Sequence, residues 1–181
     1  FRAKEWDKFF REMRWDGISK DTFARTVSGE TYAWQYWVDK LGYKYHMHDI
    51  SAAIGLVQLS KLERNNLRRR ELVERYVASL RDLSWLKLPV EREYAKSSWH
   101  IFHLTLENEK ARDALIAHLK RDKISPGVHY YPINLHPYYQ ALGIKSNVPV
   151  AENVWKRIIS LPLFPDLTEQ QFDRIIGSLK R

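Results

Sequence analysis

A polar loop ahead of a long helical pattern carries the first residues that could bind a ligand. Tyr43, Lys44 and His46 precede Asp49, after which apolar residues recur at three- and four-residue steps. Because free N–H groups and the positive dipole end gather at a helix N-terminus, an anion could bind there, with Lys44 as a compact cation and His46 as a pH-dependent donor. The alternative is a surface loop whose lysine is solvated and whose histidine binds nothing. Asp49 itself is expected to cap the helix rather than to act as an acid or base.

A second candidate group lies beyond the turn at residues 126–127. Residues 128–131 predict a short strand that runs into Pro132, which would direct part of the segment toward a cleft. Alternate strand residues face opposite sides, so only part of the group can line one site, and burial of the rings is the competing interpretation. The residues in question are His129, Tyr130, Tyr131, Asn134 and His136.

Neither metal binding nor nucleic-acid binding is the preferred interpretation of the remaining charged residues. Cys is absent, and no histidine pair has ligand spacing with a nearby carboxylate on one face, so no metal site is expected. Residues 61–81 are rich in Lys and Arg, but Glu71 and Glu74 interrupt the run. A solvated helix face with i,i+4 ion pairs explains this pattern, and nucleic-acid binding is the less favoured alternative.

The elements that must position these residues predict an α+β fold. A long helix should start at Asp49 and continue to Leu80, and strands are expected at 85–90, 98–106 and 128–131. Further helices are expected after Asn108, around 138–142, over 151–159, and after the capping box at 168–171. The result is a long helix with a small antiparallel or mixed sheet and flanking helices.

The composition is that of a soluble globular chain with anionic partners. Hydrophobic residues make up 44% of the 181 residues, and the formal net charge is +8. A positive field favours phosphorylated or carboxylate ligands. No apolar stretch reaches the length of a membrane span, so we expect a cytoplasmic protein that does not bind membranes. The chain opens on Phe1 without a cap or turn, which suggests a fragment of a longer protein.

Four collinear segments resemble the DegT/StrS-type sugar aminotransferases. The first and most specific is residues 42–59, GYKYHMHDISAAIGLVQL. The others are Ser98-Trp99-His100, residues 128–132 (VHYYP) and residues 159–165 (ISLPLFP). Each would be weak alone, but together they run in order along nearly the whole chain.

The resemblance implies the C-terminal part of a fold-type-I aminotransferase that uses pyridoxal phosphate. Residues 1–48 would be the end of the large cofactor domain and a connecting loop, and residues 49–181 the long helix and the small α/β domain. Such enzymes act as homodimers and transfer an amino group, usually from glutamate, to a keto-sugar attached to a nucleotide. The family's lysine that holds the cofactor has no counterpart in residues 1–41, so we expect the 181-residue chain to be inactive alone.

Site residues follow from the same resemblance. The loop at 43–48 would reach into the neighbouring subunit, where the position of His46, commonly Asn or Arg, touches the cofactor phosphate, with Lys44 and Tyr43 beside it. The segment from His129 to His136 would line the substrate channel. The competing function is a non-catalytic module that binds a nucleotide-sugar or a protein through exposed rings at Trp6, Phe9, Trp34 and Trp37.

Overall fold

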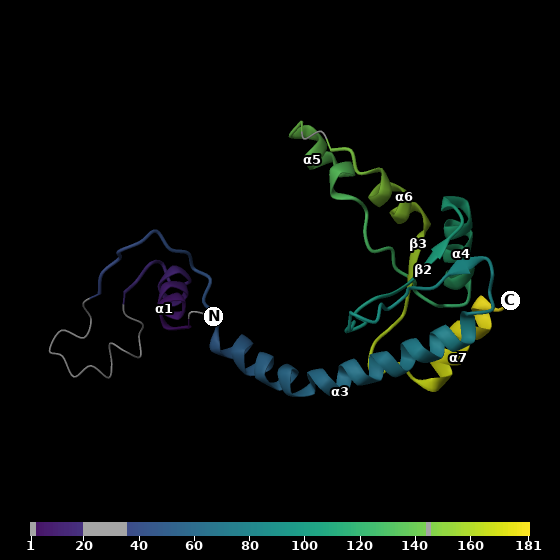
Figure 1. The fold of residues 1–181 in the computed structure, drawn as a ribbon, viewed down its shortest axis with the longest axis horizontal. Coiled ribbons are helices and arrows are strands. Elements are labelled where there is room, and N and C mark those ends of the chain that lie inside the picture. Colours follow the sequence, from purple (N-terminus) through teal and green to yellow (C-terminus); the bar gives the residue numbers. More distant parts are fainter. Residues whose placement is uncertain (1–2, 20–35, 144–145) are drawn as a thin grey trace. The chain divides into compact units, whose positions relative to one another are not determined.

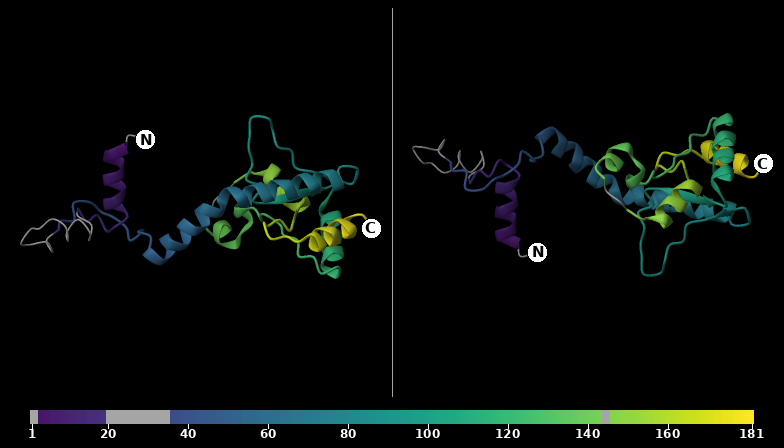
Figure 2. Two further views of the ribbon diagram at one scale, coloured as in Figure 1. Left: turned by 90° about the horizontal axis from the view of Figure 1, so that it is seen from below. Right: turned by 90° about the horizontal axis from the view of Figure 1, so that it is seen from above.

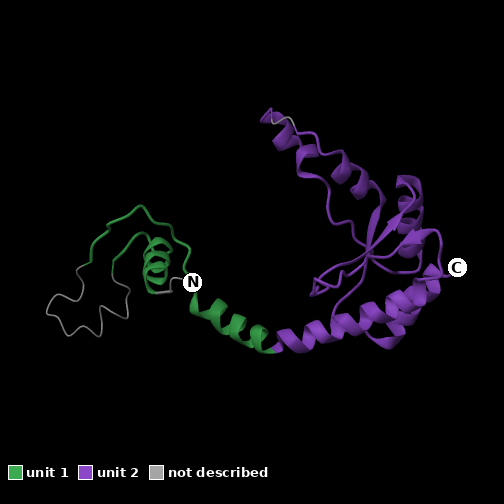
Figure 3. Ribbon diagram, in the orientation of Figure 1, with its two compact units in different colours: residues 1–60 green, residues 61–181 purple. Residues whose placement is uncertain are grey.

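The structure is a computed structural model that describes residues 3–19, 36–143 and 146–181 (Figure 1). The chain divides into two compact units, Phe1–Ser60 and Lys61–Arg181 (Figure 3). The division falls inside the long helix. Trp34, one of the rings expected on an exposed face, lies outside the described residues.

The first unit begins with helix α1 (Ala3–Met13), whose aromatic residues are incompletely covered. Trp6 stacks on Phe10 with ring centroids 5.7 Å apart, yet Trp6, Phe9 and Trp37 remain 49%, 37% and 64% exposed. The described residues of this unit therefore leave these rings partly exposed.

An antiparallel pairing of the chain around residues 15–18 with residues 38–44 follows α1. Trp15 pairs with Lys44 and Ile18 with Val38. The backbone between these two isolated bridges requires glycine at position 17. Gly17 has φ +74°, and a Cβ there would lie 1.9 Å from the Lys40 carbonyl oxygen, while a Cβ on Gly42 would lie 2.0 Å from the Gly17 nitrogen.

Helix α3 (Asp49–Leu80) is a single helix of 32 residues. It begins at Asp49 itself, and the His48 carbonyl accepts the Ala52 N–H at 2.9 Å. The expectation that Asp49 is the N-cap was therefore wrong by one position, although its carboxylate still lies in the first turn, where the helix dipole favours it. The C-terminal half of the helix buries Leu72, Val73, Tyr76 and Leu80.

A three-stranded antiparallel sheet with the order β1-β2-β3 forms the centre of the second unit. Its strands are β1 (Leu86–Lys87), β2 (Phe102–Leu106) and β3 (Ile158–Leu161). In β2, Phe102, Leu104 and Leu106 are buried, while the residues between them are only partly covered. This alternation is the period-2 pattern of a sheet with one core face.

The strand expectations were partly wrong: the strand expected at 85–90 is only Leu86–Lys87, and the one expected at 98–106 begins at Phe102. Residues 128–131 do not form a strand, because pairing stops at a single bridge between Gly127 and Ser160. The helix expected over 151–159 ends earlier, as α6 (Pro149–Arg157), and the chain enters β3 directly. All four residues of β3 are buried, so its sequence lacks the alternation that would mark a strand.

The remaining helices complete the expected α+β fold. Asn108 caps α4 (Glu109–Arg121) by accepting the Ala111 N–H, and Thr168 forms a complete capping box for α7 (Glu169–Leu179). Helix α4 contacts the sheet and α7, and Figure 2 shows α4 and α7 side by side near the C-terminus. The short η1 (Ile133–Leu135) and α5 (Pro137–Ala141) lie in the connection to α6. Among the described helices none is long and apolar enough to cross a membrane.

Candidate functional site

The loop at 43–48 places the side chains of Lys44 and His46 on the same side of its backbone, against the ring of Trp15. The Lys44 Nζ lies 3.9 Å from the Trp15 ring centroid and 3.4 Å from Asp16 Oδ2. The His46 and Trp15 ring centroids are 4.1 Å apart. Because alternate residues of an extended chain share a side, the two candidate anion ligands come together on one aromatic platform.

The imidazole of His46 has an unused polar atom. Its Nδ1 is buried and has no hydrogen-bond partner in the described part of the chain. Burial lowers the pKa of His46, and the neighbouring basic side chains, Lys44 first, lower it further, against the opposing effect of Asp16. The ring is therefore held toward its neutral form, and one of its nitrogens is buried without a partner in the described part of the chain.

Tyr43 lies on the opposite side of the same segment. Its ring stacks on Tyr45 with centroids 5.0 Å apart and an interplanar angle of 5°, and the residue is 50% exposed. Two hydrogen bonds fix the backbone of Tyr43. Its N–H donates to the Met13 carbonyl at 2.7 Å, and its carbonyl accepts the Asp16 N–H at 3.1 Å. Tyr43 is thus separated from the Trp15 platform that Lys44 and His46 share.

In the second unit His129 is anchored to β3. Its Nδ1 lies 2.8 Å from Ser160 Oγ, and its ring packs edge-on against Tyr130 at 4.8 Å between centroids. Tyr130 itself is 70% exposed. The loop conformation, rather than strand alternation, therefore separates the half-buried histidine from the projecting tyrosine.

Tyr131 and His136 form a second small cluster with Trp155 of α6. The Tyr131 ring contacts His136 and Trp155 edge-on, at 5.0 Å and 4.9 Å between centroids. The buried Arg112 of α4 donates to the Trp155 carbonyl at 3.2 Å and so helps to fix the backbone of Trp155 in this cluster. Part of the predicted group is thus packed, as the competing interpretation expected.

Asn134 contributes to an open pocket of about 600 Å³ in the connection from η1 to α6. Its amide donates to Glu152 Oε1 at 2.7 Å. Gln140, Asn147 and Ser146 also line the pocket. Five predicted substrate residues are therefore divided among three places in this unit: the Ser160 contact, the Trp155 cluster and this amide-rich pocket.

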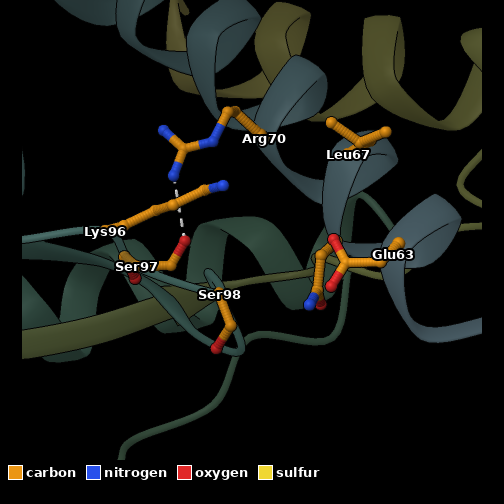
Figure 4. Close-up of a pocket in the computed structure, with 7 residues that line it drawn as sticks. Glu63, Leu67, Arg70, Lys96, Ser97 and Ser98 are labelled. Carbon is orange, nitrogen blue, oxygen red and sulfur yellow. Dashed lines mark hydrogen bonds between the residues drawn. The ribbon is translucent and has the colours of Figure 1, made fainter. Parts of the chain in front are cut away.

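A polar pocket that the sequence did not single out lies between α3 and the segment before β2 (Figure 4). It measures about 210 Å³ and is lined by Glu63, Asn66, Leu67, Arg70, Lys96, Ser97 and Ser98. Arg70 donates to both carboxylate oxygens of Glu91, at 2.7 and 2.9 Å, and to the Ser97 carbonyl at 3.0 Å. Its charge is therefore already matched, and the arginine holds the segment to the helix.

Several residues that complete these sites went unnoticed in the sequence. Trp15 and Asp16 at the loop, and Ser160, Glu152 and Arg112 in the second unit, carry no motif of their own. Ser160 lies within the ISLPLFP segment, which was the available signal. Within residues 3–19, 36–143 and 146–181, no three His, Asp or Glu side chains are grouped as metal ligands.

Comparison with known proteins identifies the family. The sequence profile of the DegT/DnrJ/EryC1/StrS aminotransferase family matches residues 5–180. The spore coat polysaccharide biosynthesis protein SpsC of Bacillus subtilis is 34% identical over 176 residues, which cover 94% of this chain and 45% of SpsC.

Solved structures agree with this match. The aminotransferase TlmJ from Streptoalloteichus hindustanus is 27% identical, with a TM-score of 0.81 over 99% of this chain and 45% of TlmJ. The sugar aminotransferase Spr1654 from Streptococcus pneumoniae, in its PMP form, is 30% identical, with a TM-score of 0.87 over the same shares of the two chains. The chain thus spans about half the length of the relatives it matches. With a profile match along almost its full length and the fold of the solved sugar aminotransferases, the chain belongs to the DegT/DnrJ/EryC1/StrS aminotransferase family.

Proposed function

We propose that this chain is the C-terminal portion of an aminotransferase that transfers an amino group from glutamate to a nucleotide-linked keto-sugar. The observation that carries the proposal is the pairing of Lys44 with the partnerless His46 nitrogen on Trp15, in a chain of this family. All three expected ligands (pyridoxal phosphate, glutamate and a sugar nucleotide) are anionic. The net charge of +8 favours their approach.

Residues of the 43–48 loop fit one part of the cofactor, its phosphate. A phosphate oxygen can receive a hydrogen bond from His46 and a charge-assisted bond from Lys44, and it would compete with Asp16 for that ammonium. Bound pyridoxal phosphate supplies an electron sink for the amino-group transfer. In this proposal Lys44 and His46 hold the phosphate end from the Trp15 side, Tyr43 contacts the cofactor from the other side of the segment, and a lysine upstream of Phe1 holds the aldehyde end.

The substrate would be positioned by the segment from His129 to His136. His129 has a ring nitrogen outside its Ser160 contact, and the exposed Tyr130 offers a phenol beside it. Asn134 and its amide-rich pocket suit a ligand with many hydroxyl and carbonyl groups, as a nucleotide-sugar has. We further propose that the longer chain forms a homodimer in the cytoplasm, in which the 43–48 loop of one subunit contacts the cofactor of the other.

The test compares this chain with a longer one that includes the residues upstream of Phe1. Each is mixed with equimolar pyridoxal phosphate, reduced with borohydride and analysed by peptide mass spectrometry. We expect one stoichiometric pyridoxyl-lysine in the longer chain and none in the 181-residue chain. A stoichiometric pyridoxyl-lysine within residues 1–181 would remove the proposal that the lysine lies upstream.

The phosphate role is tested in the longer chain with Lys44→Gln. Loss of one charge-assisted hydrogen bond should weaken cofactor retention by about 10-fold. Lys4→Gln is the matched control, since it removes an exposed lysine of the same unit.

If the longer chain takes up no cofactor but binds UDP-N-acetylglucosamine, the proposal of a non-catalytic binding module replaces the proposal of an aminotransferase.

A further inference from the structure

The segment that ends at His129 is fixed to β3 through backbone and side chain together. Gly127 and Ser160 exchange backbone hydrogen bonds of 2.9 and 2.7 Å, so Gly127 lies beside the strand. The His129 ring then lies over Gly127. A Cβ at position 127 would be 2.5 Å from His129 Cε1, so the ring can occupy this place only above a glycine.

The hydroxyl of Ser160 determines which nitrogen of that ring carries the proton. Ser160 is 4% exposed, and its only side-chain hydrogen bond among the described residues is the 2.8 Å contact with His129 Nδ1. His103 lies opposite Ser160 in the β2–β3 register but makes no hydrogen bond with it. Because a buried O–H that lacks an acceptor is costly, Ser160 must donate to Nδ1. In the neutral ring the proton then resides on Nε2.

We propose that Ser160 and Gly127 are positioning residues that hold His129 in the Nε2–H tautomer, as a neutral hydrogen-bond donor. Nε2 has no hydrogen bond in the described part of the chain, so this N–H is available to an acceptor oxygen of a ligand. The assignment to a sugar-nucleotide oxygen rests on the function proposed above. The tautomer itself does not, because it follows from contacts within this chain.

The experiment is nitrogen-15 NMR of the imidazole rings in the 181-residue chain, at a pH of about 8 so that an ordinary histidine is neutral. We expect His129 Nδ1 to show the shift of a non-protonated nitrogen and Nε2 that of a protonated one. Ser160→Ala should move both nitrogens toward the averaged shifts of a freely exchanging ring. Ser160→Thr keeps the hydroxyl and should restore the wild-type spectrum.

Ser178→Ala is the matched control, since Ser178 is also buried, at 1% exposed, but donates to Asp122 instead. It should leave the His129 signals unchanged. A wild-type spectrum with the proton on Nδ1, or a Ser160→Ala spectrum identical to wild type, would overturn the inference. Both readings are taken without ligand, so a failure here is distinct from a failure of the aminotransferase proposal, which the pyridoxyl-lysine experiment reports.

Discussion

Tyr76 links α3 to the chain that leaves β3, and its hydroxyl can be removed without opening a large cavity. The side chain is fully buried, and its ring stacks on Phe102 at 4.9 Å and contacts Phe172 at 4.7 Å between centroids. Its hydroxyl donates to the Pro162 carbonyl at 2.9 Å. Tyr76→Phe keeps the ring contacts but leaves that carbonyl without its donor. We expect a loss of about 1–2 kcal/mol in the free energy of unfolding of this unit.

Amide hydrogen exchange of β2 measures this loss in the unit that contains Tyr76. The amides of Phe102–Leu106 lie in the central strand and should exchange only when the unit opens. A loss of 1–2 kcal/mol corresponds to exchange faster by about 5- to 30-fold. Tyr94→Phe removes the same atom from a residue that is 89% exposed, and it should change the exchange rates by less than about 2-fold.

The comparison of the two variants decides whether the hydrogen bond contributes net stability. If Tyr76→Phe exchanged as slowly as the wild type, the hydroxyl would gain no more from Pro162 than from water, and the reasoning from the buried bond would be refuted. If Tyr94→Phe accelerated exchange equally, the effect would belong to the loss of any phenol rather than to this contact.

Three further outcomes are expected. Hydrogen bonding from Arg70 lowers the pKa of Glu91 from 4.5 to about 2. The ionised carboxylate therefore stabilises the fold fully at a pH above 4.5, and this stabilisation is lost as the pH falls toward 2. Glu91→Gln should flatten the pH dependence of the free energy of unfolding in urea between these two values. Thr168→Ala removes the α7 cap and should cost about 1 kcal/mol in the same assay. Gly42→Ala would place a Cβ 2.0 Å from the Gly17 nitrogen, so the Tyr43 amide should lose exchange protection while the β2 amides keep theirs.

Signals confined to a few neighbouring residues were reliable in this sequence. The Asn108 cap and the Thr168 capping box are confirmed, because both depend on a side chain and a backbone N–H three positions away. The strand β3 was missed for the opposite reason. Its four buried residues follow α6 without a break, and only pairing with β2 distinguishes them from a continued helix.

The candidate sites depended on partners that are distant in the sequence. The motif at 43–48 singled out Lys44 and His46. Both side chains contact the ring of Trp15, which lies far from them in the sequence and outside the motif. The sequence left the charge of His46 open to pH, whereas burial and neighbouring basic side chains lower its pKa. For His129, the decisive neighbour Ser160 is 31 positions away.

The order of helices, the α+β class and the resemblance to sugar aminotransferases were all present in the sequence by itself, because periodicity, caps and motifs are properties of residues close together along the chain. Tertiary structure alone decided that 128–131 is no strand, that Asn134 bonds to Glu152, and that His129 meets a buried hydroxyl. Those outcomes depend on which backbone groups and side chains remain unpaired once distant segments pack together, and no local pattern encodes that.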